Sequence, residues 1–191
     1  MRKLVFESDR LIIRPLENSD FQIWSNSLNK AFPKKNIYDT VHPDEYIIDE
    51  EDFYRDVYFD NDNMKKDFTY KFGIFLKQPK YFIGYISAMD ISRGIFQNAY
   101  IGYALINTFW NKGYGREAVS CFTSEAMKAL SLHRFEAGIE IENIFSKNLI
   151  ESCGYRYEGI SKKRLSLRKE WRDILVYAIT EEDLITNPQV I

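Results

Sequence analysis

The stretch AYIGYALINTFWNKGYGREA, residues 99–118, decides the fold of this chain. Residues 100–106 form an apolar run of strand length, residues 111–115 hold two glycines around one aromatic, and residues 117–130 have helical periodicity. The first amides of a helix lack internal partners and lie at the positive end of its dipole, so this strand, turn and helix can bind a phosphate. The two glycines alone would equally suit a tight connection with no ligand.

Four segments resemble one protein family. Residues 110–118, WNKGYGREA, resemble the acyl-coenzyme A loop W-x-K-G-Y-[AG]-x-E-A of the GNAT N-acetyltransferase superfamily, in its RimJ/RimL branch. Residues 8–16, SDRLIIRPL, resemble the opening strand of that branch, and residues 171–177, WRDILVY, resemble its closing strand. Residues 143–159 resemble its N-x-x-S segment and the G-F-x-x-E-G segment that follows. Because the four occur in the family's order and spacing, the chain is identified as a member of this branch.

The resemblance implies the GNAT (acyl-CoA N-acyltransferase) fold, an α+β fold in which helices flank a mixed, mostly antiparallel central sheet. We expect a single domain over residues 1–191, which is an ordinary length for one domain. Patterns along the chain predict strands at 11–14, 68–76, 81–91, from 97 onward and at 135–141, and two closing strands around 167–170. They predict helices from 18 to about 30 with a Ser19/Gln22 capping box, within 36–64, at 117–130, from Asn143 to before Gly154, and after Thr180.

The composition is that of a globular protein, with 45% hydrophobic and 28% charged residues. No apolar run approaches the ~20 residues that a bilayer requires, and no leader pattern stands at the start, so we expect a cytoplasmic protein without a membrane partner. Cys121 and Cys153 lack CxxC spacing, and His42 and His133 lack neighbouring ligands, so we expect neither a disulfide nor a metal. Cys121 is expected to be a buried small hydrophobe.

Acidic side chains concentrate between residues 36 and 64, where Arg55 is the one basic residue. The ten acids are Asp39, Asp44, Glu45, Asp49, Glu50, Glu51, Asp52, Asp56, Asp60 and Asp62. Apolar residues between them have roughly helical spacing and predict an amphipathic helix with an acidic face. That face either serves solubility alone or, because it would border the acceptor side of a GNAT cleft, attracts a cationic acceptor.

Acetyl transfer from a thioester to an amine requires a deprotonated amine, a polarised carbonyl and a stabilised thiolate. The resemblance implies that acetyl-CoA is the cosubstrate, held by main-chain groups of the strand and by amides of the glycine loop, with charge from Lys112 and Arg116. The cofactor-binding residues expected on this basis are Ala104, Leu105, Ile106, Lys112, Gly113, Tyr114, Gly115, Arg116, Asn143 and Ser146.

The resemblance also implies that Asn143 contacts the pantetheine arm and that Ser146 protonates the departing thiolate. Asn143 is also well placed to cap the helix that it begins. Many GNAT enzymes use as the acid a tyrosine four residues before the later glycine, but Ile150 occupies that position here.

The general base is less evident. Many relatives carry a glutamate two residues before the glycine of the I-G-Y motif, where this chain has Tyr100. Glu140 and Glu142, near the end of the strand beside the cofactor, are the replacements we expect. Either carboxylate would equally suit a solvated strand end.

The resulting hypothesis is an acetyl-CoA-dependent N-acetyltransferase that transfers acetyl directly to a primary amine, either a protein N-terminus or a small cationic amine. No covalent intermediate is needed, because no cysteine or serine has an evident base partner. The alternative is a non-catalytic acyl-CoA-binding or regulatory module, favoured by Tyr100 in place of a carboxylate. The resemblance is also compatible with a homodimer.

A basic cluster near the end of the chain has three interpretations. It comprises Lys162, Lys163, Arg164, Arg168, Lys169 and Arg172. It is an exposed hairpin face, or it contacts the coenzyme 3′-phosphate, or it binds an anionic partner such as ribosomal RNA. No interleaved aromatic residues provide a stacking platform, so a nucleic-acid partner is not expected.

Overall fold

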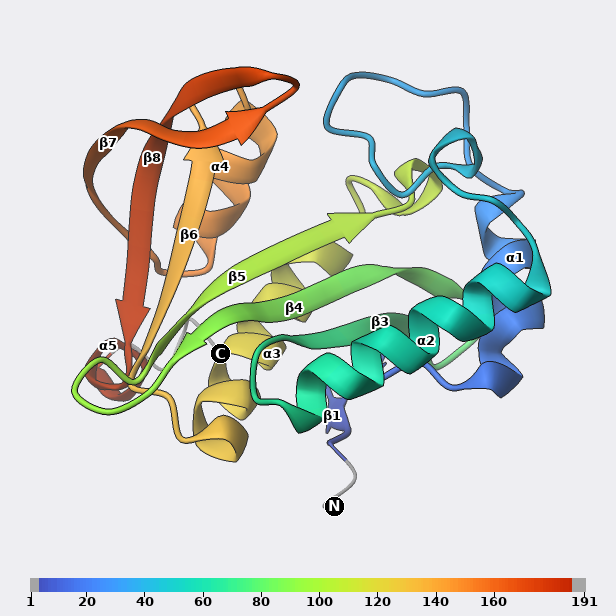
Figure 1. Cartoon of the computed structure of the whole chain (residues 1–191), viewed down its shortest axis with the longest axis horizontal. Coiled ribbons are helices and arrows are strands. Elements are labelled where there is room, and N and C mark those ends of the chain that lie inside the picture. Colours follow the sequence, from blue (N-terminus) through green and yellow to red (C-terminus); the bar gives the residue numbers. More distant parts are fainter. Residues whose placement is uncertain (1–3, 187–191) are drawn as a thin grey trace.

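The computed structural model describes residues 4–186, in which eight strands form one sheet in the order β1-β2-β3-β4-β5-β6-β8-β7 (Figure 1). The strands are β1 (Phe6–Glu7), β2 (Leu11–Arg14), β3 (Tyr70–Leu76), β4 (Phe82–Ser92), β5 (Asn98–Leu105), β6 (Arg134–Glu140), β7 (Arg156–Leu167) and β8 (Glu170–Thr180). Only β5 and β6 pair in parallel; the other neighbours are antiparallel. The expected mixed, mostly antiparallel sheet is therefore confirmed.

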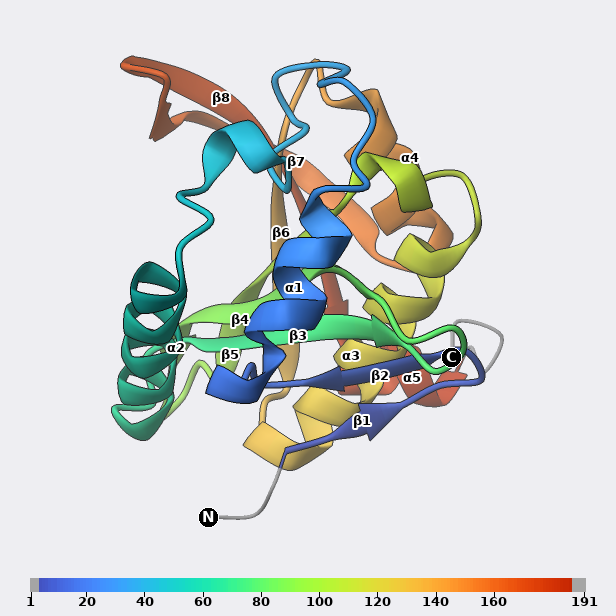
Figure 2. The ribbon, with the colours of Figure 1, turned by 90° about the vertical axis from the view of Figure 1, so that its right-hand side faces the viewer.

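The helices connect these strands and cover both faces of the sheet. They are α1 (Phe21–Leu28), α2 (Glu50–Lys65), α3 (Tyr114–Leu130), α4 (Ile144–Ser152) and α5 (Glu181–Thr186). In Figure 2 α2 and α3 lie on opposite sides of the central strands. No helix within residues 4–186 is both long enough and apolar enough to cross a membrane.

Aromatic side chains join the helices to the two faces of the sheet. On one face, the Trp24 ring of α1 lies 4.9 Å from that of Phe53 in α2, and Trp24 Nε1 donates a 2.6 Å hydrogen bond to Tyr85 of β4. On the other, Phe122 of α3 packs edge-on against Phe72 of β3 at 5.2 Å. Burial of such large apolar groups is the main favourable contribution to the fold.

The central pair of strands diverges along its length. β5 and β6 are in register only from Asn98 opposite Arg134 to Tyr100 opposite Glu136. Beyond Tyr100, β5 continues beside β4 and β6 continues beside β8, and the two strands part visibly (Figure 1). The main-chain groups of residues 101–105 that point toward β6 therefore have no strand partner there, and buried groups of this kind require another partner.

The acidic segment is α-helical only in its second half, and its first half contains one short 3-10 turn, Pro43–Glu45. α2 begins at Glu50, where the Asp49 side chain caps it by accepting from the amides of Glu51 and Asp52. The preceding residues form an irregular loop that holds the fully buried Asp39, whose carboxylate accepts a 2.8 Å hydrogen bond from Asn107. The expectation of one helix was therefore wrong for the first half, because hydrogen bonds to a distant segment outweigh local apolar spacing.

Three local predictions need correction. The helix α1 ends at Leu28 rather than near residue 30. Its entry is not stabilised by a Ser19/Gln22 box, because the Asp20 carboxylate instead accepts from the Glu17 amide at 2.8 Å. Cys121 is partly rather than fully buried, and burial raises the pKa of its thiol to about 11. The predicted caps at Asn143, Gly154 and Thr180 were correct.

Candidate active site

The glycine loop leads from β5 into the open N-terminus of α3. Gly113 precedes the helix with φ of 79°, in the left-handed region that favours glycine. Trp110 Nε1 donates a 2.8 Å hydrogen bond to the Leu105 carbonyl and so ties the loop to the end of β5. The first helical hydrogen bond runs from the Glu117 amide to the Gly113 carbonyl, so the three preceding amides lack helical partners.

The cations of this loop have no carboxylate partner in the described part of the chain. In residues 4–186, neither Lys112 nor Arg116 forms an ion pair with a carboxylate. Two free positive charges beside an open helix N-terminus form an environment that favours phosphate oxygens. These are properties that the predicted pyrophosphate site requires.

Arg10, near the start of the chain, anchors the glycine loop to β2. Its guanidinium donates to the Lys112 carbonyl at 3.1 Å and to the Glu117 carboxylate at 2.6 Å, and it lies 4.5 Å from the centre of the Tyr114 ring. Ser8 also donates to Glu117, at 2.7 Å. Burial opposes the charged form of Glu117, but the hydrogen bonds from Ser8 and Arg10 outweigh it and lower the pKa of this carboxyl. The loop is therefore anchored to the start of the chain.

Close packing explains the small residue at position 115. A Cβ atom on Gly115 would lie 3.2 Å from Leu149 Cδ2 of α4 and 3.7 Å from Leu105 Cδ1 of β5. The first turn of α3 is thus wedged between α4 and the end of β5. A larger side chain here would have to displace Leu149 or project outward.

The structure brings Ser146 to β5 across the divergence of the strands. Asn143 caps α4 by accepting a hydrogen bond from the Ser146 amide at 3.2 Å. The Tyr103 hydroxyl of β5 lies 2.9 Å from Ser146 Oγ and 3.2 Å from the Ser146 carbonyl oxygen. Burial raises the pKa of Tyr103 well above its ordinary value, so its hydroxyl stays protonated. Sequence reasoning did not single out Tyr103 as a site residue, since no local pattern reveals a partner 43 residues away.

The two candidate bases lie together and face arginines. Glu140 is buried at the end of β6, and its carboxylate pairs with the Arg168 guanidinium and lies 3.5 Å from Arg172 Nε. Glu142 is more exposed and lies 3.3 Å from Arg172 Nη2. In the described part of the chain neither carboxylate contacts Ser146 or Tyr103 directly. A role for either as general base stays a prediction, and Glu140 would first have to exchange its arginine partner.

Tyr100, at the position where many relatives carry the basic glutamate, has a different partner. Its hydroxyl accepts a 2.8 Å hydrogen bond from Arg164 of β7. Burial is the largest cause that raises the pKa of Tyr100, and the Glu136 carboxylate raises it further. This residue therefore remains a protonated phenol at neutral pH.

Part of the basic cluster is paired with carboxylates, some within the C-terminal hairpin and some at or just after the end of β6. Lys162 pairs with Asp173 at 2.8 Å, and Arg172 bridges Glu142 and Glu170. Of the three interpretations, the contacts favour an exposed hairpin face.

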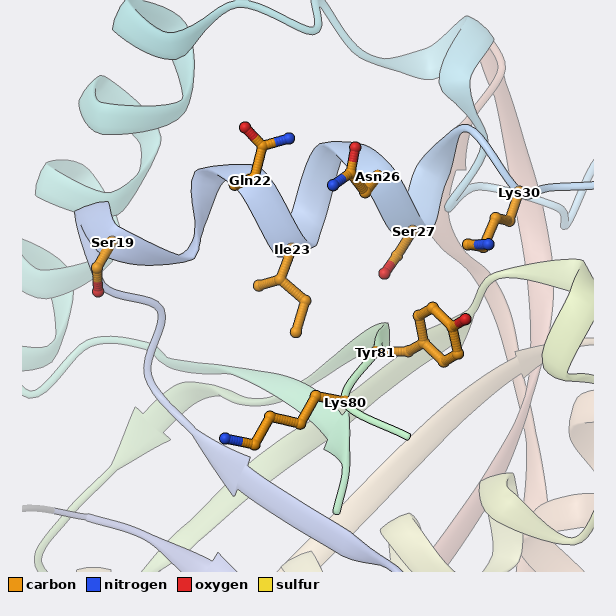
Figure 3. Close-up of a pocket in the computed structure, with 8 residues that line it drawn as sticks. All are labelled: Ser19, Gln22, Ile23, Asn26, Ser27, Lys30, Lys80 and Tyr81. Atoms are coloured by element: carbon orange, nitrogen blue, oxygen red, sulfur yellow. The ribbon is translucent and has the colours of Figure 1, made fainter. Parts of the chain in front are cut away.

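The hollows of the surface do not by themselves identify the site. One of about 640 Å³ lies beside α1 and contains none of the predicted site residues (Figure 3). It is lined by Ser19, Gln22, Ile23, Asn26, Ser27, Lys30, Lys80 and Tyr81. A hollow of about 570 Å³ reaches the glycine loop at Gly113 and Arg116, between the start of the chain and α3. Across residues 4–186, no three His, Cys, Asp or Glu side chains are grouped as a metal site requires.

The sheet with two parted central strands, and the glycine loop that opens a helix beside them, define an acyl-CoA-transferase type of fold. Residues 10–156 match the family model described as Acetyltransferase (GNAT) domain, and the chain belongs to this family.

Named relatives extend this comparison. The probable N-acetyltransferase YjcK of Bacillus subtilis is 33% identical over 175 residues, which cover 91% of this chain and 95% of that protein. The ribosomal protein uS5-alanine N-acetyltransferase of Escherichia coli is 28% identical over 123 residues, or 64% of this chain and 63% of that protein. Mycobacterium smegmatis RimJ, solved in complex with CoA-disulfide, shares the fold with a TM-score of 0.73 at 21% identity, covering 93% of this chain and 89% of that one.

Proposed function

We propose that this chain is a single-domain, acetyl-CoA-dependent N-acetyltransferase that transfers acetyl directly to a primary amine. The observation that carries the proposal is the parting of β5 and β6 beside the open N-terminus of α3. An extended thioester fits such an arrangement, with its phosphates at the helix and its arm between the strands. The names of both curated relatives, which are N-acetyltransferases, favour a catalyst over a non-catalytic module.

In this proposal the glycine loop binds the pyrophosphate. The amides of Gly113, Tyr114, Gly115 and Arg116 donate to it, and Lys112 and Arg116 supply charge that no carboxylate of the described chain already uses. The main-chain groups of Ala104, Leu105 and Ile106 bind the pantetheine arm and the thioester carbonyl. Asn143 adds an amide contact from the start of α4 while it caps that helix.

The transfer forms an N–C bond between the amine and the acetyl carbon and breaks the C–S bond. Backbone N–H groups of β5 stabilise the charge that develops on the carbonyl oxygen. Ser146 donates its proton to the departing thiolate and regains a proton from solvent water. The proton of the amine passes to Glu140 or Glu142, directly or through water; of the two, Glu142 is the more accessible.

A cationic amine is the acceptor class that the surface favours. The exposed acids of α2 border the face of the sheet opposite α3, and charge of one sign raises the local concentration of an oppositely charged substrate. The Escherichia coli relative, named for a ribosomal-protein alanine, makes a protein N-terminus the second acceptor class. We place the enzyme in the cytoplasm and expect it to function without a metal or nucleic acid; a homodimer is the assembly to test.

Thiol release tests this function. Acetyl-CoA is incubated with the protein and with polyamines, aminoglycosides, amino acids and N-terminal peptides of ribosomal proteins, and acetyl-CoA binding is measured separately by calorimetry. Release of CoA with one of these amines is expected. Tight binding without release across the panel would favour the non-catalytic module, and absence of binding would contradict both.

A further inference from the structure

Two hydroxyl groups meet where β5 and α4 face each other across the parted strands. Tyr103 comes from the part of β5 that no longer pairs with β6, and Ser146 comes from the helix that follows β6. Their oxygens are 2.9 Å apart. The contact therefore spans the opening in which the thioester is proposed to lie.

The hydroxyl of Tyr103 has a specific reason to be there. Phenylalanine would fill the same largely buried space, and burying a phenol without a partner costs free energy. In residues 4–186 both hydrogen-bond partners of this hydroxyl, the carbonyl and Oγ, belong to Ser146. The phenol therefore serves to hold this one serine.

The contact between Tyr103 and Ser146 bears on the direction of the serine proton. A phenol has one proton to donate, and the shorter of its two contacts is the one to Ser146 Oγ. When the phenol donates to Oγ, that oxygen is satisfied as an acceptor and its own proton is free to point elsewhere. Burial raises the pKa of Tyr103, so the phenol keeps its proton and is able to donate it.

The start of α4 adds a second influence on the same serine. Ser146 is the third residue of a nine-residue helix, and its amide is fixed by the Asn143 side chain. The positive end of the helix dipole stabilises negative charge nearby, such as that on a departing sulfur. A serine proton directed at that sulfur would add a hydrogen bond to the same charge.

We propose that Tyr103 is a positioning residue for acetyl transfer, which donates to Ser146 Oγ and so directs the serine proton at the leaving thiolate. This inference rests on the proposed function and adds to it a residue outside the glycine loop and the N-x-x-S segment.

Tyr103→Phe tests the proposal, with Tyr155→Phe as its matched control. Tyr155 is also buried, and its hydroxyl makes a 2.8 Å contact with a second hydroxyl, but that of Thr123 in α3 rather than that of Ser146. We expect Tyr103→Phe to lower kcat about tenfold, the scale of one hydrogen bond, and to leave the KM for acetyl-CoA within twofold. Tyr155→Phe should change neither, although both variants lose one buried hydrogen bond.

A double-mutant cycle tells positioning from a general loss of structure. If Tyr103 acts through Ser146, then adding Tyr103→Phe to Ser146→Ala should slow turnover no further. If the rate losses of the two single variants multiply in the double variant, or if Tyr103→Phe keeps the wild-type kcat, the positioning role is overturned. The proposed function would remain intact in either case. Absence of turnover in the wild-type protein with every amine would instead refute the function on which the inference rests.

Discussion

Gly115 shows how much one residue contributes to the glycine loop. Its Cα faces Leu149 and Leu105, and its amide belongs to the first turn of α3. Size and charge are therefore both restricted at this position. The two restrictions can be separated by two substitutions.

Gly115→Asp should weaken acetyl-CoA binding by tenfold or more, because a carboxylate would repel the pyrophosphate at a helix N-terminus. Gly115→Ala is the size control: the tightest contact of its methyl would be with the flexible end of Leu149, at 3.2 Å, and affinity should change less than threefold. Calorimetric titration with acetyl-CoA measures both. Equal affinities for the aspartate variant and the wild type would refute the pyrophosphate assignment.

Ser146→Ala should reduce kcat by roughly 10- to 100-fold, since a positioned proton donor typically contributes at least that factor. The dissociation constant for acetyl-CoA should change little, because the backbone amide of residue 146 still donates its hydrogen bond to the Asn143 side chain. Ser152→Ala on the same helix is the control, since its hydroxyl donates to the Leu149 carbonyl at 2.7 Å and Ser152 has no place in the proposed mechanism. Unchanged turnover in Ser146→Ala would remove this serine from the mechanism.

At the scale of elements, the anchor between the start of the chain and α3 is the feature with a measurable pH dependence. Glu117 has a lowered pKa in the folded protein because Ser8 and Arg10 bond to its carboxylate. A lowered pKa stabilises the fold above the ordinary carboxyl pKa, and this contribution is lost as pH falls through the folded value.

Glu117→Gln should therefore destabilise the protein at pH 7 by about 1 kcal/mol, a figure that allows for the partial exposure of the pair. The difference from wild type should shrink as the pH is lowered below about 4.5. Urea unfolding at pH 7 and at successively lower pH measures it. A destabilisation of the same size at every pH would show that the charge of Glu117 is not the cause.

The acidic segment illustrates a different behaviour of elements. α2 follows the expected amphipathic pattern, with Phe53 and Val57 buried. The loop before it does not, because Asn107 binds the loop at Phe32 and Asp39 with bonds of 2.7–2.8 Å. The loop also brings the Tyr38 ring within 5.9 Å of the Arg168 guanidinium, so it links the end of β5 to the C-terminal hairpin.

For the whole molecule, charge distribution matters more than net charge, which is only −2. If acids of α2 attract a cationic acceptor, the KM for a polyamine should rise several-fold between about 50 and 300 mM salt, because added ions screen the attraction. A neutral amine acceptor measured under the same conditions serves as the control. Equal salt dependence for both acceptors would assign the acidic face to solubility alone.

Local features of the sequence determined the strands other than β1, the glycine loop, the caps of α4 and α5 and the family, because these depend on residues close together along the chain. Tertiary structure alone decided which side chains became partners. Tyr103 meets Ser146 across 43 residues, Arg10 meets Glu117 across 107, and Arg168 meets Glu140 across 28. A hydrogen bond requires donor and acceptor within about 3 Å, and strand packing, rather than any local pattern, sets that distance. The sequence therefore predicted where the glycine loop lies, whereas the fold determined which groups hold the loop, the serine and the glutamate.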